Sequence, residues 1–429
     1  MNLPILLLLV SISTKTEGRV WDLVSAVKTA NKSSEKIRQS NAEYEASKEE
    51  NKASRSRFLP TLDFETRWDK TSEDISTSQK DPVGRRTYHG MLRQRLFSPK
   101  SWYLYKKTEA ESEAFNLATD DQVYSYQADT VQLYLDLLRL ESLMNQLNHS
   151  YESIDKEKSR SSRKVDSGIL TRMAIDELGV RLSEIALMRN ETSRKRDFLK
   201  LVFQERLGQS FYGVKPLKKG FDLKSITSLS LEKDLQNLPQ RNTKVIKASS
   251  DVNLRKIETE KRTSEFLPEV NSFLELSRLS SHSLKDSKQV TAGIELKWTI
   301  FSGGGSFHKT LASKKREVAA KHGYREVLIQ ENLNLKKAAA HLKKCGSRIK
   351  HLQDKSRYLN NMVISESKRF RGGISEFSEY IKKKSELQDS QLEITVEKFD
   401  CLLAYIKYMR HSGHLNIQTI SKISQSWFE

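Results

Sequence analysis

Proline is scarce in this 429-residue chain, and its absence from two long stretches is informative. The seven prolines leave residues 100–215 and 269–429 without any. Because proline interrupts helix interiors, these stretches are able to hold very long helices. The composition agrees, since 30% charged and only 37% hydrophobic residues suit solvated helices in thin bundles.

Long apolar runs are also missing. The apolar run at residues 3–10 is too short to cross a bilayer as a helix. Small and polar residues follow it, so we interpret 1–18 as a secretory signal peptide, with a buried N-terminal helix as the alternative. No cysteine follows the run to carry a lipid anchor. Anchoring to a membrane must then come from the fold itself.

The sequence motifs of common enzymes are absent too. There is no phosphate-binding glycine loop and no His-Glu-x-x-His helix, and Gly303 and Gly304 follow a predicted strand without a Walker lysine. Too few histidines and cysteines converge in the sequence to indicate a metal site. We therefore expect no catalytic residues, no cofactor and no metal.

The net charge of +19 raises the question of a nucleic-acid partner. The basic residues are mixed with acidic ones along helical segments, as at 156–158 and 382–386, which favours a solvated helix face. A basic coiled-coil scaffold or nucleic-acid-binding protein is the alternative interpretation. It leaves the signal peptide and the strands described next unexplained.

Three landmarks occur twice in the chain. Phe-Leu-Pro at 58–60 recurs at 266–268, Leu-Phe-Ser at 96–98 recurs as Ile-Phe-Ser at 300–302, and the segment 164–169 recurs at 369–374. Their offsets lie between 204 and 208 residues. Near-equal offsets indicate an internal duplication, which organises the whole fold.

Within each repeat the first two landmarks bracket a β-hairpin, at about 59–97 and 267–301. The last strand alternates strictly, because one face carries the apolar residues Val290, Ala292, Ile294, Leu296, Trp298 and Ile300. Strands of ten to twelve residues suit a bilayer crossing. A membrane barrel needs at least about eight strands and no open edge, so four strands per chain predict a trimer with twelve.

The remaining residues read as helices. We predict a long helix over 100–163 with a return helix over 169–207, and the same plan after Phe301, with a turn at Gly372 and Gly373. The predicted layout is a signal peptide (1–18), repeat 1 (19–210), a linker (211–240), repeat 2 (241–412) and a C-terminal tail (413–429). The fold class is thus mainly α with a small β part.

This order of landmarks resembles the TolC outer-membrane efflux protein family over essentially the whole mature chain. The residues at the starts and ends of the strands carry the resemblance, with 298–304 as the best match to a family signature. The residues at the starts and ends of the strands are Pro60, Phe97, Pro268, Phe301, Gly303 and Gly304.

The resemblance implies a homotrimer in the outer membrane with a helical tunnel through the periplasm. It also implies a periplasmic adaptor and an inner-membrane pump as partners, in a tripartite efflux or type I secretion system whose cargo is left open. The helix turns would lie at the periplasmic tip and contact the adaptor. Their residues are Lys164, Val165, Ser167, Gly168, Ile169, Arg369, Phe370, Gly372, Gly373 and Ile374.

The family resemblance further implies an acidic residue at the channel entrance, six positions after the second turn glycine. Glu379 stands there, whereas Lys382 replaces the second acidic residue three positions later. Glu376 lies one turn before Glu379 and could complete a pair on the same helix face. A solvated surface glutamate is the alternative interpretation.

The two cysteines, Cys345 and Cys401, lie at similar distances before and after the second turn. On an antiparallel helix pair they would be nearly level, which permits a disulfide in an oxidising compartment. Two independently buried thiols are the alternative.

Overall fold

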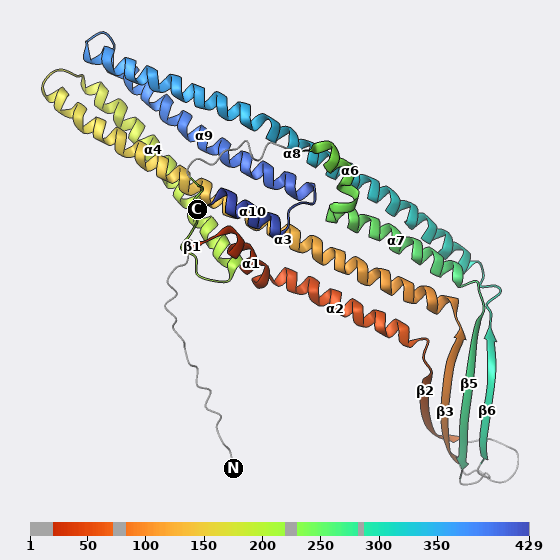
Figure 1. Cartoon of the computed structure of the whole chain (residues 1–429). Helices are drawn as coiled ribbons and strands as arrows, with labels where there is room; N and C mark the ends of the chain where they lie inside the picture. Colours follow the sequence, from red (N-terminus) through yellow and green to blue (C-terminus); the bar gives the residue numbers. More distant parts are fainter. Residues whose placement is uncertain (1–19, 72–82, 219–229, 282–286, 429) are drawn as a thin grey trace, which may run out of the picture. The chain divides into compact units, whose positions relative to one another are not determined.

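Two very long helices dominate the chain (Figure 1). The computed structural model describes residues 20–71, 83–218, 230–281 and 287–428, so the predicted signal peptide lies outside the described residues. Helix α3 spans Pro99–Asp166 and α8 spans Gly305–Arg371. At 1.5 Å per residue, each is about 100 Å long. This agrees with the long helices predicted from the absence of proline.

Each long helix is followed by a return helix. Helix α4 (Arg172–Leu207) follows α3, and α9 (Phe377–His411) follows α8. The order helix, two strands, long helix, return helix occurs twice, with α2 (Glu35–Ser56) and α7 (Thr243–Ser264) in the first position. The predicted fold class, mainly α with a small β part, is confirmed.

The chain divides into two compact units, which are described separately. One contains Arg38–Asp121 and Thr243–Gln330, and we call it the sheet unit. The other contains Met1–Ile37, Gln122–Asn242 and Glu331–Glu429, and we call it the hairpin unit.

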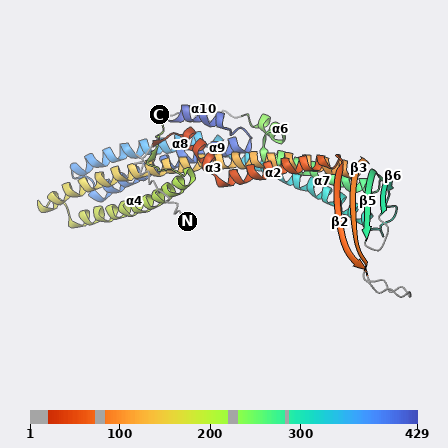
Figure 2. The same cartoon turned by 90° about the horizontal axis from the view of Figure 1, so that it is seen from below.

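The sheet unit contains an antiparallel sheet of four strands (Figures 1 and 2). The strands are β2 (Thr61–Thr71), β3 (Val83–Phe97), β5 (Glu269–Ser281) and β6 (Ser287–Lys297), in the order β2-β3-β5-β6. The two hairpins therefore join through β3 and β5. Small polar side chains pack α2 against the first part of α3, as in the 2.7 Å hydrogen bond between the Ser54 and Thr108 hydroxyls.

The hairpin unit packs the two helical hairpins against each other. Its apolar core takes residues from α3, α4 and α9, including Ile154, Leu178 and Phe377. Ion pairs add to it: Arg181 of α4 lies 2.6 Å from Asp389 of α9, and Lys384 of α9 lies 3.3 Å from Glu157 of α3. Both repeats are thus held together by this unit.

Short elements complete the hairpin unit: α1 (Leu23–Ser33), α6 (Leu231–Arg241), α10 (Ile417–Trp427), and the parallel pair of β1 (Val20–Trp21) and β4 (Gly213–Val214). Tyr134 is fully buried among them, and its hydroxyl donates a 3.1 Å hydrogen bond to the Trp21 carbonyl. The segment predicted as a C-terminal tail holds α10, whose Trp427 packs on Tyr405. Within the described ranges, no helix is both long and apolar enough to cross a membrane.

Candidate functional site

The register of the four-stranded sheet aligns apolar residues from all strands into rows. Leu62 pairs with Leu92, Leu92 with Leu274, and Leu274 with Ala292. The next row runs through Phe64, Gly90, Leu276 and Val290. Because side chains alternate between faces along a strand, these rows share one face of the sheet. Both rows are free of polar side chains across all four strands, whereas the next row of the same face carries Arg278 and Lys288.

The opposite face of the sheet is polar. A row on it runs through Glu65, His89, Ser277 and Gln289. His89 Nε2 lies 2.9 Å from the Glu275 carboxylate, which belongs to an adjacent row of the same face. The sheet therefore has one face suited to lipid and one suited to water.

Within the described residues of the single chain, nothing covers the apolar face. Leu62, Phe64 and Trp68 are 77%, 73% and 74% exposed, although side chains of this size are ordinarily buried. Among the described residues, the outer strands β2 and β6 each pair along one edge only. Exposed edges and a bare apolar face are both unfavourable in water, so this sheet needs a partner or a lipid environment.

The residues that carry the family resemblance lie where the strands meet the helices. Pro60 and Pro268 stand just before β2 and β5, and Phe97 ends β3 beside a β-bulge. Phe301, Gly303 and Gly304 connect β6 to α8, and both glycines adopt positive φ angles of 63° and 78°. Such angles strain residues with a Cβ, which explains glycine at these positions.

Aromatic side chains gather at the same ends of the strands. Trp298 donates a 3.0 Å hydrogen bond from Nε1 to the Phe266 carbonyl, and Phe58 packs edge-on against Trp102. Trp298 is 54% exposed and Phe301 is 83% exposed. Exposed aromatic rings with a polar partner are typical of the level at which a membrane meets water.

The two predicted turns have the same hydrogen bonds. Gly168 N–H donates to the Val165 carbonyl and Ile169 N–H to the Lys164 carbonyl. Gly373 N–H likewise donates to Phe370, and Ile374 N–H to Arg369. This is the Schellman motif, with the glycine at a positive φ of 73° in the first turn and 72° in the second. The sequence landmarks thus correspond to equivalent helix ends.

The turns also lie close to each other within the hairpin unit. Lys164 Nζ stands 5.3 Å from the centre of the Phe370 ring, and Phe370 packs against Phe377. Ile169 and Ile374 remain 69% and 72% exposed. Ser167 and Gly372 are also exposed. The two helix ends therefore present apolar side chains beside basic ones.

The entrance candidates lie at the start of α9. Glu376 is the N-cap residue and accepts a 3.2 Å hydrogen bond from the Ser378 hydroxyl, and Glu379 lies in the first helical turn. Both glutamates are exposed. Nearby, burial and then the Glu157 carboxylate raise the pKa of the Tyr380 hydroxyl above its ordinary value of 10.0. That hydroxyl is therefore protonated at neutral pH and able to donate.

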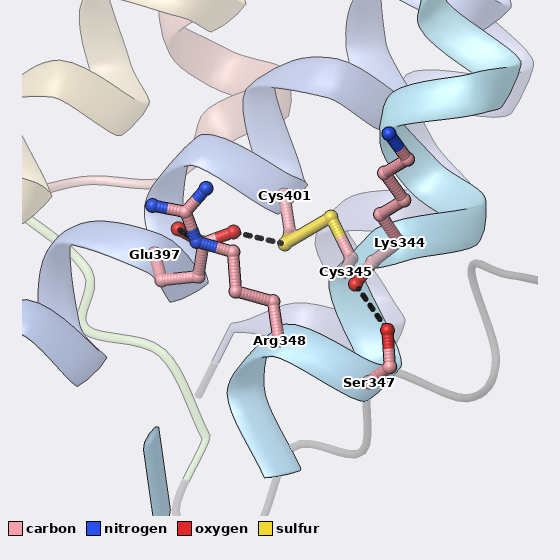
Figure 3. The surroundings of a disulfide bond; sticks show 6 residues. All are labelled: Lys344, Cys345, Ser347, Arg348, Glu397 and Cys401. Atoms are coloured by element: carbon pink, nitrogen blue, oxygen red, sulfur yellow. Dashed lines mark hydrogen bonds and ion pairs between the residues drawn. A yellow bond between two sulfur atoms is a disulfide. The ribbon is translucent and has the colours of Figure 1, made fainter. Parts of the chain in front are cut away.

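Cys345 of α8 and Cys401 of α9 form a disulfide with their Cα atoms 5.9 Å apart. The bond links the two helices directly (Figure 3). Both cysteines are fully buried, and Ile349 packs beside them. The bond joins the long helix and the return helix of the second repeat 27 residues before the turn.

The sequence interpretation missed the surroundings of this disulfide. His341 lies one helical turn before Cys345, and Glu397 lies one turn before Cys401. Ligand atoms of His341, Cys345 and Glu397 all lie within 4.8 Å of one another. The expectation of no metal site counted only histidines and cysteines as ligands and left out Glu397. The spacing of four residues, from His341 to Cys345 and from Glu397 to Cys401, is visible in the sequence and places each pair on one helix face.

Comparison with known proteins identifies the fold. No protein-family model matches the chain, and no curated protein matches its sequence. Solved structures do match. A membrane protein from Pseudomonas aeruginosa has a TM-score of 0.82 at 14% identity, over 92% of this chain and 91% of that one.

Two further structures cover nearly the whole chain. The outer membrane protein VceC from Vibrio cholerae has a TM-score of 0.80 at 11% identity, over 91% of this chain and 96% of that one. The CmeC outer membrane channel of Campylobacter jejuni has a TM-score of 0.78 at 14% identity, over 97% and 94%. The resemblance predicted from the sequence is thus confirmed at the level of the fold, which is that of the TolC-like outer-membrane efflux channels.

Proposed function

We propose that three copies of this chain form a channel through an outer membrane, and that the protein is not an enzyme. The four-stranded sheet carries this proposal. Its apolar face has no cover within the described part of the chain, and its two outer strands each have a free edge. Lipid supplies the cover, and pairing of β2 with β6 of the next copy removes both edges.

The stoichiometry follows from the strand count. A barrel needs at least about eight strands, and two copies of a four-stranded sheet would form a narrow one filled by side chains. Three copies give about twelve strands, enough for a water-filled lumen lined by the polar face. The structural neighbours include an outer membrane channel, which supports this choice.

The long helices suit the remaining length of such a conduit. At about 100 Å each, α3 and α8 are able to extend from the outer membrane through the periplasm. The mixed charge of these helices suits solvent on both sides of a tunnel wall. Nucleic acid is not a partner in this proposal, because the basic residues belong to solvated helix faces.

The turns at Gly168 and Gly373 are proposed to bind a periplasmic adaptor, which links the channel to an inner-membrane pump. The exposed Ile169 and Ile374, with Lys164 and Arg369 beside them, offer an apolar contact with a basic rim. An acidic and apolar adaptor surface would match it. Drug efflux and type I secretion both use this arrangement.

Glu379, with Glu376 beside it, is proposed to control which ions pass the channel entrance. Three copies of an exposed carboxylate around a closed entrance form a negative ring that attracts cations and repels anions. The ion pairs that hold α9 to the first repeat, Lys384 with Glu157 and Arg181 with Asp389, would keep that ring closed. Opening then requires these contacts to break or α9 to move.

Conductance of the purified protein in planar lipid bilayers tests the channel. We expect discrete current steps of one main size after insertion of detergent-solubilised protein, and none from a heat-denatured sample. Membrane fractionation distinguishes the channel from the alternative of a basic coiled-coil scaffold. High salt would release a basic scaffold from the membrane, whereas a barrel is released only by detergent. A protein that washes off as a soluble monomer and carries no current would contradict the proposal.

Site-specific photo-crosslinking tests the adaptor contact. A photoreactive residue in place of Ser167, at the first turn, should crosslink to a periplasmic partner in intact cells. Ser347 is an exposed serine inside α8 and serves as the matched control. Equal crosslinking from both positions would remove the turn from the proposed contact and leave the channel proposal in place.

A further inference from the structure

A histidine and a glutamate, His341 and Glu397, lie beside the disulfide. Cys345 and His341 are spaced by four on α8, and Cys401 and Glu397 are spaced by four on α9, so each pair shares one helix face. Both sulfurs are fully buried, and Glu397 is 5% exposed. The ligand atoms of His341, Cys345 and Glu397 converge within 4.8 Å.

The carboxylate of Glu397 is held in a fixed orientation (Figure 3). Its Oε2 lies 2.8 Å from Arg348 Nε, while its Oε1 lies 4.0 Å from Cys401 Sγ. A disulfide sulfur has no hydrogen to donate, so this second contact is not a hydrogen bond in the oxidised chain. Metal-binding carboxylates are commonly supported by such a second partner, so Arg348 could orient Glu397 as a ligand.

We propose that the reduced form of this cluster binds a thiophilic metal ion of the Zn²⁺ class, and that the disulfide is the form that excludes the metal. The ligands would be both cysteine sulfurs, one imidazole nitrogen of His341 and Oε1 of Glu397. One nitrogen, two sulfurs and one oxygen make a tetrahedral donor set that suits Zn²⁺. Arg348 would keep its ion pair with Oε2 and balance the net charge of −1.

The chemistry balances in two steps. A dithiol or phosphine reductant delivers two electrons, and with two protons the Cys345–Cys401 bond becomes two thiols while the reductant is oxidised. Zn²⁺ then displaces both thiol protons and binds the two thiolates. The two sulfurs must separate from bonding distance, which rotation of the cysteine side chains provides. A disulfide oxidant reverses the change, because it takes the two electrons, becomes two thiolates, restores the Cys345–Cys401 bond and releases Zn²⁺.

A cavity lies beside the cluster and reaches one of its members, His341. It has a volume of about 320 Å³ and lies between α8 and α9, with His341 on its wall. Lys337 and Lys407 also line it and repel cations, so we expect slow entry rather than exclusion. His341 is the exposed member of the cluster and is the first ligand that an entering ion would meet.

Metal content of the full-length protein in detergent tests the inference, independently of any channel activity. The chain is reduced anaerobically with a phosphine, freed of reductant, incubated with Zn²⁺ and measured by mass spectrometry of the bound metal. We expect about one ion per chain in the reduced protein and none in the oxidised protein. Co²⁺ in place of Zn²⁺ should give the thiolate-to-metal absorption of a tetrahedral site.

Matched histidine variants separate this site from adventitious binding. His341→Ala should weaken Zn²⁺ affinity by about tenfold or more in competition with a chromophoric chelator. His351→Ala, an exposed histidine on the same helix, should leave it unchanged. Equal affinities of the two variants would overturn the proposal, as would a reduced protein with two titratable thiols and no bound metal. In either case the disulfide is structural only.

Discussion

A charge on the apolar face of the sheet should prevent the barrel from forming. Leu276 lies in the row with Phe64, Gly90 and Val290, and it is the eighth of the 13 residues of β5. At about 3.4 Å per residue the strand is about 44 Å long, and a tilt of about 45° gives a height of about 31 Å. Leu276 therefore lies inside a hydrocarbon layer of about 30 Å, one row from Arg278 and Lys288 of the same face.

The substitution Leu276→Arg should cost about 2–4 kcal/mol per chain at that depth. Three copies in one barrel bring the total to about 6–12 kcal/mol, which is comparable with the whole stability of many domains. Ser277→Arg is the matched control, because it adds the same side chain at the next position on the opposite, polar face. We expect it to cost less than about 1 kcal/mol, since it faces the water-filled lumen.

Folding into lipid vesicles measures this difference. The fraction of each variant that becomes membrane-inserted is followed across a guanidinium titration, and the trimer is detected by its resistance to unheated detergent gels. Leu276→Arg should fail to insert under conditions in which Ser277→Arg inserts like the unchanged protein. Equal insertion of both variants, or a worse result for Ser277→Arg, would refute the assignment of the two faces.

Three further experiments test the helical parts. Gly168→Ala and Gly373→Ala should each lower the free energy of unfolding by about 1–2 kcal/mol in denaturant titrations, because their φ angles are positive. An added Cβ meets no neighbour within 4 Å at either position, so this cost comes from the backbone conformation alone. Gly346→Ala, inside α8 and equally open, should instead stabilise by about 1 kcal/mol, and the same sign at all three would contradict the turn geometry. Burial, then the hydrogen bond to Asp234, raises the pKa of Tyr408 above its ordinary value of 10.0. The protonated hydroxyl thus stabilises the fold fully below pH 10, and this contribution is lost as pH rises above that value. Tyr408→Phe should therefore flatten the fall in stability above pH 10, in unfolding titrations at each pH. Glu379→Gln should lower cation selectivity and cation block in planar bilayers, and unchanged values would remove Glu379 from the entrance.

The helices and the positions of the hairpins could be predicted from local signals. Missing prolines gave the length of α3 and α8, and strict alternation from Val290 to Leu296 located β6. Glycine in a repeated segment located both turns, because each of these helix ends needs a residue that adopts a positive φ. Each of these signals lies within the segment that it predicts.

The pairing between distant segments could not be predicted in the same way. The apolar row depends on Leu92 lying opposite Leu274, a register set by strands about 180 residues apart. Strand β3 alternates weakly because Gly90 takes the place of an apolar residue in the second row. The sequence predicts a tail where the structure has α10, because the 11 residues of this helix carry little intrinsic helical stability and depend on packing such as Trp427 on Tyr405. The convergence of His341 and Glu397 beside the disulfide likewise required the placement of α8 against α9.

Crosslinking of the two free sheet edges tests the central claim most directly. A cysteine in place of Glu65, on the outer strand β2, is combined in turn with a cysteine at Gln289, Thr291 or Glu295 on the outer strand β6. If β2 of one copy pairs with β6 of the next in a closed ring of three, oxidation in the membrane should yield covalent dimers and trimers and nothing larger. Monomers alone at every combination, or a ladder that continues past three chains, would contradict the account.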